Sequence, residues 1–483
     1  MAYRNGKRNQ MTFLPSCIED YVSPEDPVRA YDAFVEALDL KELGITYNPH
    51  KVGNSEYNPQ AMLKLLVYGY SYGWKSSRRL ERAIHHNLSF IWLMGGLKPD
   101  HKTISEFRRN NKNAIKKVLK QCVRMCIALD LIDGNILFVD GTKIRANAAR
   151  GKNYSKKHYQ ARLAAIGERI NKLLDECERI DHQENEQESL VKMKEELKNS
   201  KKLRHKIQDI LKQFQQQEQQ GIARKTINLT DPDSALMKSI QGSHASYNGQ
   251  SVVDDKNGLI IHADVVSHTS DLNQFAQQVT QAEAVVKKQC QVASADAGYA
   301  DTEELEKIDQ RGTKVIVPSQ RQALHKPEKP FSKSVFSYDK EQNCYYCPEG
   351  HKLVYKGKQA QGKLQYLITT ASICKRCKHY GICTKAKRGR KIVRLEKEEI
   401  KERFEREYEK ASSQEIYARR KARVEHPFGH IKRNLGTNNF LLRGREGVQA
   451  EFTIAATCFN IARMITIFGS VTGLSYQFAN LQV

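Results

Sequence analysis

Two short apolar runs that each lead directly into an aspartate are the strongest constraint on how this chain folds. The run "ILFV" precedes Asp140, and the run "VASA" precedes Asp296. A continuous apolar run bounded by turn residues is typical of a buried strand. We therefore expect each aspartate to stand at the exit of a strand, and we expect Gly141 and Thr142 to turn the chain out of the sheet after Asp140.

Segments with strand and helix character alternate after the first aspartate. The sequence "DKNG" separates two β-like segments and predicts a hairpin, and helical segments then alternate with the runs "VASA" and "TKVIVPS". The order strand, hairpin, helix, strand, helix, strand predicts an α/β core with a mixed sheet.

Residues from about 15 to 130 are predicted to be helical. Asn58 and Pro59 form an N-cap and first-turn pair, and Thr103 stands three residues before Glu106, the spacing of a capping box. The helix that follows is rich in cations: Arg108, Arg109, Lys112, Lys116, Lys117 and Lys120. This composition favours a DNA-docking module, with a helical bundle that carries a solvated basic face as the alternative.

Residues from about 155 to 220 are predicted to form a coiled-coil insertion. Apolar residues recur there at steps of three and four, at Leu163, Ile166, Ile170, Leu173, Cys177 and Ile180. Apolar positions resume at Leu190 after the polar stretch "DHQENEQES". The pattern predicts two antiparallel helices joined near residues 181–189.

The charge of the chain favours a polyanionic partner. Lys and Arg total 79 against 55 Asp and Glu, which gives a net charge of +24, and the pI is near 9.4. Nucleic acid is the first expectation, ahead of a basic surface without a specific partner, and a membrane partner is not expected.

The cellular setting is expected to be the cytoplasm. The opening "MAYRNGKRNQ" lacks an apolar signal core, and the 11 cysteines are an odd number without a secretion signal. The apolar window Val448–Phe468 is interrupted by Glu451, Asn460 and Arg463, so we expect a buried core helix there.

Three acids form the candidate catalytic site. Asp140 and Asp296 are predicted at the ends of strands, and Glu425 lies in a basic helical region with Lys432 seven residues further on. Carboxylates are the ligands that Mg²⁺ or Mn²⁺ prefers, and two such ions can activate water and stabilise the leaving oxygen of a phosphodiester. The alternative is that an aspartate before a glycine is only a turn residue.

A cysteine-rich segment is the candidate zinc site. Cys374 and Cys377 have the spacing of a zinc knuckle, and a second CxxC pair, Cys344 and Cys347, precedes them by about thirty residues. Four thiolates around a tetrahedral ion predict structural zinc. Reduced surface thiols are the alternative.

Several motifs resemble bacterial insertion-sequence transposases of the DDE type. They are "FVDGTKIRANA", "SADAGYAD" and "RVEHPFGHIKRNLG", in that order, and further segments such as "PDHKTISEFRR" and "YNGQSVVD". The resemblance implies a ribonuclease H-like core with Asp140, Asp296 and Glu425 as catalytic residues. It also implies Mg²⁺-dependent cleavage and joining of DNA at terminal inverted repeats.

Related transposases carry a Tyr, an Arg, the Glu and a Lys at set spacing. Tyr417, Arg420 and Lys432 are the matching residues here, although Arg420 is one position further from the Glu than the pattern has, and Arg423 competes with it. Pro427 requires either a bend after the Glu or a new helix. The full set expected to bind DNA or phosphate is Lys143, Arg145, Arg420, Arg423, Lys432 and Arg433.

The resemblance also selects zinc ligands and a domain plan. It favours Cys347, Cys374, Cys377 and Cys383 as ligands, with Cys344, His351 or His379 as substitutes. The expected domains are a helical DNA-binding domain (1–130), the catalytic core (131–335 and 396–470), a coiled hairpin insertion (155–220), a zinc-ribbon insertion (336–395) and a tail (471–483).

The expected partners are inverted-repeat and target DNA, together with at least a second copy of the chain, because two element ends must be joined. A structure-specific nuclease on the same core and a catalytically silent DNA-binding derivative are the alternatives.

Overall fold

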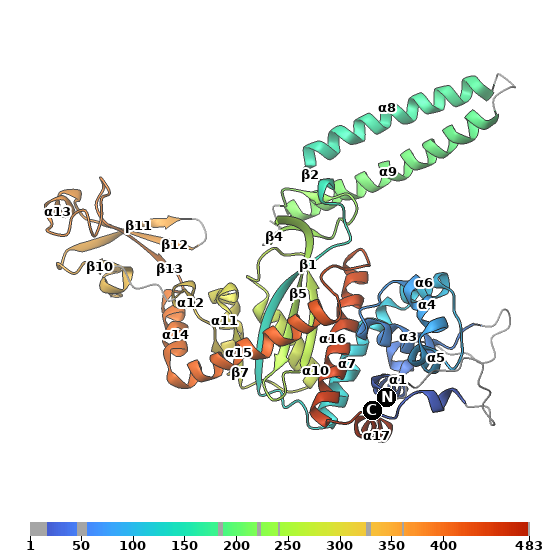
Figure 1. Ribbon diagram of the computed structural model, residues 1–483. Coiled ribbons are helices and arrows are strands. Elements are labelled where there is room, and N and C mark those ends of the chain that lie inside the picture. Colours follow the sequence, from blue (N-terminus) through green and yellow to red (C-terminus); the bar gives the residue numbers. More distant parts are fainter. Residues whose placement is uncertain are drawn as a thin grey trace, which may run out of the picture. The chain divides into compact units, whose positions relative to one another are not determined.

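The computed structural model describes residues 17–45, 56–181, 187–219, 224–239, 242–324, 330–359 and 362–481 (Figure 1). The fold is mixed α/β, which confirms the predicted class. Two compact units divide the chain. The first comprises Met1–Asp271, Gln278–Cys290 and Lys421–Val483, and the second comprises Leu272–Gln277 and Gln291–Arg420.

The N-terminal part of the first unit is helical, as predicted. Its elements are η1 (Ile18–Tyr21), α1 (Pro27–Glu36), α2 (Leu40–Leu43), α3 (Pro59–Ser71), α4 (Ser77–His86), α5 (Leu88–Leu93), α6 (His101–Asn110) and α7 (Lys112–Ala128). Asn58 caps α3 by accepting a hydrogen bond from the amide of Gln60, and Pro59 is the first residue of that helix, so this predicted start is confirmed.

The predicted start and continuity of the basic helix are wrong. Asp100, not Thr103, is the cap of α6, because its carboxylate accepts from the amide of Thr103 at 2.7 Å. The basic segment is split at Asn111 into α6 and α7. Arg108 is only 5% exposed and donates to the backbone carbonyl of Lys75, so it does not belong to a solvated basic face.

The sheet of the first unit is built around its longest strand, β5 (Gly242–Asp254). This strand pairs antiparallel with β1 (Ile136–Arg145), β4 (Ala235–Ser239) and β6 (Ile260–Val266). The β5–β6 hairpin that "DKNG" predicted is present, with Gly258 at a positive φ of 70°.

The expected exit from the sheet after Asp140 is wrong. The strand β1 continues to Arg145, and Gly141 and Thr142 pair with Gln250 and Gly249. The reason is that β5 offers 13 residues of backbone, and β1 gains ladder hydrogen bonds by following it. Asp140 therefore stands within a strand.

The helix α16 (Arg445–Phe468) is the central helix of the first unit. It packs against β6, α7 and α3. Glycine at position 249 permits this packing, because a Cβ there would lie 3.0 Å from the ring of Phe452. By length and composition α16 is the one described helix that could cross a membrane, but most of its apolar window is buried, as predicted for a core helix.

A two-helix arm extends from the first unit. It consists of α8 (Lys156–Asp181) and α9 (Gln187–Gln219), which lie side by side in Figure 1. The short strands β2 (Asn153–Tyr154) and β3 (Ile227–Asn228) pair antiparallel at its base, beside η2 (Arg150–Lys152). The helical hairpin follows the coiled-coil pattern, and the side chains of Cys177 and Ile180 lie outside the described residues.

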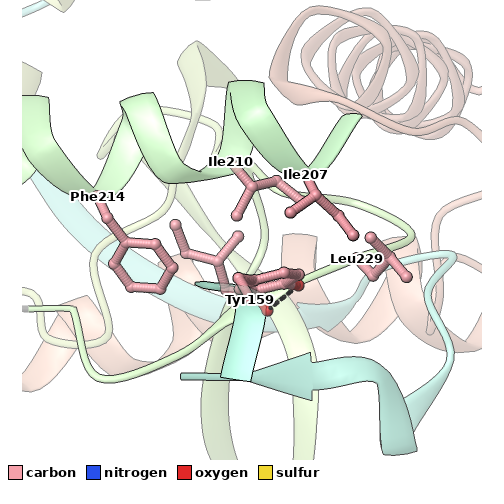
Figure 2. Packing of buried hydrophobic residues seen from close by; sticks show 6 residues of the cluster. Tyr159, Ile207, Ile210, Phe214 and Leu229 are labelled. Carbon is pink, nitrogen blue, oxygen red and sulfur yellow. Dashed lines mark hydrogen bonds between the residues drawn. The ribbon is translucent and has the colours of Figure 1, made fainter. Parts of the chain in front are cut away.

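Buried residues close the base of this arm (Figure 2). Ile207, Ile210 and Phe214 of α9 pack on Tyr159 of α8 and on Leu229. The hydroxyl of Tyr159 donates to the carbonyl of Ile227 at 2.9 Å, so the one polar atom of this side chain is satisfied. Further along the seam, Ile170 and Leu173 are buried as the spacing predicted.

The second unit contains a parallel strand pair and an antiparallel sheet. The strands β7 (Val292–Ala295) and β8 (Lys314–Ile316) are parallel and enclose η3 (Ala297–Tyr299) and α11 (Thr302–Asp309) in sequence. The antiparallel sheet has the order β13-β12-β11-β10-β9. Its strands are β9 (Ser337–Asp339), β10 (Cys344–Tyr346), β11 (Lys352–Gln359), β12 (Lys363–Ile368) and β13 (Lys391–Leu395).

The remaining helices are α10 (Phe275–Val286), α12 (Gln320–Ala323), η4 (Lys333–Val335), α13 (Ala371–Arg376), α14 (Glu398–Glu409), α15 (Ala411–Gly429) and α17 (Val471–Asn480). Pro427 lies inside α15, and a π-helical segment, η5 (His430–Asn434), follows directly. No new helix starts at Pro427, because α15 continues through the proline to Gly429. The wider π-helical turn instead adjoins the proline, which cannot donate its own backbone hydrogen bond.

Candidate catalytic site

Asp140 is held within β1 in a half-buried position. One of its carboxylate oxygens accepts a hydrogen bond from the amide of Gly141 at 2.8 Å. Because side chains alternate along a strand, Asp140 and Thr142 share one face of the sheet and Lys143 lies on the other.

Lys432 reaches this face of the sheet from η5. Its amino group donates a hydrogen bond to the hydroxyl of Thr142, across 290 positions of sequence. Burial lowers the pKa of Lys432, and the carboxylate of Asp140 opposes that decrease. The structure therefore brings Asp140, Thr142 and Lys432 together.

Asp296, unlike Asp140, follows directly after the end of its strand, β7, in the second unit. It is the N-cap of η3, and its carboxylate accepts from the amide of Gly298 at 2.7 Å. This capping explains why an acid follows a dry strand here.

Tyr417 and Arg420 gather near Asp296. The guanidinium of Arg420 lies 5.3 Å from the centre of the Tyr417 ring. Burial raises the pKa of Tyr417, Arg420 lowers it, and the carboxylate of Asp296 raises it further. Tyr417 and Arg420 of the predicted signature are thus near Asp296. Lys432 is near Asp140.

Glu425 is an exposed residue of α15, next to the buried Val424. It belongs to the first unit with Asp140, while Asp296 belongs to the second. In the part of the chain that the structure describes, no group of three or more His, Cys, Asp or Glu side chains is arranged as a metal site.

The predicted DNA-binding cations differ in their surroundings. Lys143 and Arg433 are exposed, and the amino group of Lys143 donates to the carbonyl of Lys238 at 3.3 Å. The Nε of Arg423 lies 3.4 Å from the carboxylate of Asp255, and this guanidinium also donates to the carbonyl of Lys256. Arg423 therefore has an intramolecular acceptor that phosphate would have to displace.

Four thiols predicted as zinc ligands line one small pocket in the second unit. They are Cys347, Cys374, Cys377 and Cys383, and His351 and His379 also line this pocket. Cys344 instead lies buried in β10 and is not among the lining residues.

Backbone amides point at three of these sulfurs. The amides of His351, His379 and Arg390 donate to the sulfurs of Cys347, Cys377 and Cys374, respectively. Burial raises the pKa of the Cys383 thiol, Arg390 opposes that rise, and the other three thiols add to it.

The imidazole of His379 has partners of its own. Its Nε2 lies 3.1 Å from the carboxylate of Glu349, and its ring packs 4.7 Å from the ring of Phe331.

Thr142 is the site residue that inspection of the sequence missed. The motif "DGTK" was interpreted as a turn, in which a threonine has no role. Its position two residues after Asp140 in a strand was the available signal, since such residues share a face.

Two family models match the chain. The model described as "Transposase domain (DUF772)" matches residues 16–110, and the model described as "Transposase DDE domain" matches residues 346–465. The second match includes the four pocket cysteines, Glu425 and Lys432. No curated protein and no solved structure matches the chain. Both matches are to transposase domains, and they support the resemblance to insertion-sequence DDE transposases that the motifs predicted.

Proposed function

We propose that this protein is the DNA transposase of an insertion sequence, which binds the terminal inverted repeats and catalyses phosphodiester hydrolysis and strand transfer. The observation that carries the proposal is the grouping of Asp140, Thr142 and Lys432, which places a cation beside an acid of the DDE set. A transposase needs this combination, because an anionic phosphate must approach a carboxylate site.

Asp140, Asp296 and Glu425 are the proposed catalytic acids and metal ligands. Their carboxylate oxygens are the donor type that Mg²⁺ or Mn²⁺ prefers. The amide of Gly141 fixes the rotation of Asp140, and the amide of Gly298 fixes that of Asp296. Two bound ions would activate the attacking water and stabilise the leaving oxygen.

Cations have a separate role in this proposal. Lys432 and Arg420 hold the scissile phosphate, while Lys143, Arg145 and Arg433 bind the DNA backbone and Arg423 is the weaker candidate. The half-buried amino group of Lys432 is suited to the first task, since the interaction of a charge with phosphate strengthens as water is excluded.

The cysteine pocket is proposed to hold one structural zinc ion through Cys347, Cys374, Cys377 and Cys383. Four cysteine sulfurs are the donor type that structural zinc takes, and these four line one pocket. Backbone amides that donate to sulfur stabilise thiolates and orient them, as hydrogen bonds to metal ligands do. This ion would stabilise the 336–395 insertion and leave no open position for catalysis.

The remaining parts of the plan are proposals of the same kind. The proposed domains are a ribonuclease H-like core over 131–335 and 396–470, a DNA-binding domain over 1–130, a hairpin insertion over 155–220 and a tail over 471–483. The proposed location is the cytoplasm, and the proposed assembly on DNA is at least a dimer. Residues 1–16 and 482–483 lie outside the described part.

Cleavage and joining of short terminal-repeat DNA with Mg²⁺ test the function. Asp140→Asn, Asp296→Asn and Glu425→Gln are each expected to abolish cleavage and to leave DNA binding intact. The matched control is Asp130→Asn, which changes an exposed carboxylate that pairs with Lys256. Cleaved ends without any joined product would instead favour a structure-specific nuclease.

A further inference from the structure

The loop 435–443 contacts both β1, which carries Asp140, and η5, which carries Lys432. It forms a parallel bridge with the end of β1, where the amide of Arg145 donates to Asn438 at 3.2 Å and the amide of Phe440 donates to Arg145 at 2.9 Å. At its other end, the amide of Thr437 donates to the carbonyl of Ile431 in η5 at 3.0 Å. This loop therefore fixes η5 against β1.

Glu451 holds this loop from α16. The side chain is buried, with 1% of the residue exposed, although it is a charged residue of an apolar helix. Its carboxylate accepts hydrogen bonds from the amides of Leu441, at 2.9 Å, and Leu442, at 3.0 Å. Two backbone donors of the loop thus depend on one acid.

Lys75 completes the arrangement from the N-terminal helical region. Its amino group lies 3.3 Å from the carboxylate of Glu451 and donates to the carbonyl of Asn439 at 2.9 Å. The guanidinium of Arg108 in turn donates to the carbonyl of Lys75 at 2.6 Å. The segment that precedes α4 is therefore anchored to the loop.

Close packing at Gly73 supports the same contact. This glycine has a positive φ of 67°, and a Cβ there would lie 3.1 Å from the carbonyl oxygen of Leu435. The N-terminal region thus approaches the loop both through backbone packing and through the Lys75 side chain.

Burying the charges of Lys75 and Glu451 costs free energy of desolvation, so a gain in stability alone does not explain the pair. Burial raises the pKa of Glu451 and lowers that of Lys75, while each residue opposes the shift of the other. A buried ion pair is often no more stabilising than apolar residues of the same volume. Its defined hydrogen bonds do, however, specify one conformation of the loop.

We propose that Lys75 and Glu451 are positioning residues, through which the N-terminal helical region holds the 435–443 loop and thereby keeps Lys432 beside Asp140. This inference rests on the proposed catalytic role of Asp140. It gives the N-terminal region a part in the chemistry of cleavage, separate from any part in binding DNA.

The test compares Lys75→Met with Lys64→Met in the full-length protein. Lys64 is a matched control, since its side chain is 12% exposed against 10% for Lys75, and it pairs with Asp32 at 2.6 Å within the N-terminal helices. The double variant Lys75→Met with Glu451→Gln removes both buried charges and serves if the single variant fails to fold.

Two measurements separate positioning from stability. Amide hydrogen exchange without DNA is expected to rise at Phe440, Leu441 and Leu442 in the Lys75 variants only. In cleavage assays kcat is expected to fall at least about tenfold, with KM for terminal-repeat DNA within about twofold, since small misplacements of reacting groups are costly.

Two results would overturn the inference. One is a folded Lys75 variant whose loop amides exchange at the wild-type rate. The other is a kcat that falls only in proportion to the loss of Tm, as in the Lys64→Met control. Failure of the wild-type protein to cleave any DNA would count against the proposed function instead. In that event the exchange measurement still decides whether Lys75 holds the loop.

Discussion

The amino group of Lys432 donates a hydrogen bond to the hydroxyl of Thr142, which lies two residues after Asp140 in the same strand. The contact joins a π-helical segment near the C-terminus to the first strand of the sheet. Because it places a cation beside a carboxylate, it links two parts of the predicted transposase signature that are distant in sequence.

Lys432→Met is expected to lower the cleavage rate by about 10²-fold, the usual effect of removing one donor that stabilises charge in the transition state. Thr142→Val, which removes the hydroxyl but keeps the shape, is expected to have a smaller effect. Single-turnover cleavage of saturating terminal-repeat DNA measures both. A Lys432→Met protein that cleaves at the wild-type rate would remove this lysine from the site.

Arg433 and Arg423 are expected to differ in their contribution to DNA binding. Arg433→Ala should weaken binding to all DNA sequences and reduce the slope of log K against log salt by about 1, because an exposed cation releases roughly one counterion. Arg423→Ala should leave that slope unchanged, since its guanidinium lies next to Asp255. Fluorescence anisotropy across a salt series makes the comparison.

The interaction between Arg423 and Asp255 should instead contribute to the free energy of unfolding. A double-mutant cycle with Arg423→Ala and Asp255→Ala is expected to give a coupling energy of up to about 1 kcal/mol. Zero coupling, together with a reduced salt slope for Arg423→Ala, would identify Arg423 as a phosphate ligand.

Zinc removal is expected to unfold the cysteine-rich insertion. Purified protein should contain about one zinc per chain, and Cys374→Ser or Cys377→Ser should lose both the metal and protection from proteolysis around 336–395. Cys17→Ser is the matched control, because Cys17 is an exposed free thiol. Absence of zinc from wild-type protein prepared without chelators would contradict the zinc proposal.

The raised pKa of the buried Asp254 carboxyl predicts that the free energy of unfolding depends on pH. Burial raises its pKa from 3.8 to about 6, despite hydrogen bonds from the amides of Gly134 and Lys256. Between these two values the folded state binds the proton more tightly than the unfolded chain. The contribution of this group to the free energy of unfolding therefore rises as the pH falls through about 6 toward 3.8.

Asp254→Asn should remove that contribution, which has a slope of at most about 1.4 kcal/mol per pH unit for one proton. Urea unfolding between pH 5 and 7.5 measures the slopes of both proteins. Equal slopes would show that Asp254 ionises with a similar pKa in the folded and unfolded chain, whatever the variant does to overall stability.

Local patterns predicted local structure well. The Asn58 cap, the turn of the β5–β6 hairpin and the apolar repeat of the arm helices are each signalled by residues within a few positions of one another, so the sequence alone indicates them. Asp140 shows the limit of such patterns. Its small neighbours suggested a turn, but the length of β5, more than a hundred residues later, keeps β1 in the sheet.

Side chains with distant partners were the hardest to interpret. Glu451 interrupts an apolar window, and nothing nearby in sequence shows that it accepts from the amides of Leu441 and Leu442 and pairs with Lys75. Arg108 appeared to belong to a basic face for the same reason, because its acceptor lies 33 positions away.

The paired strands at the base of the helical arm have an evolutionary consequence. The chain enters the arm at Tyr154 and returns at Ile227, and these residues are partners in one β-bridge. Because this pairing holds the two ends of the insertion together, the length of the arm can change by whole helical turns without altering the structure of the sheet that carries Asp140. Relatives can therefore differ in the reach of this arm and share one catalytic apparatus.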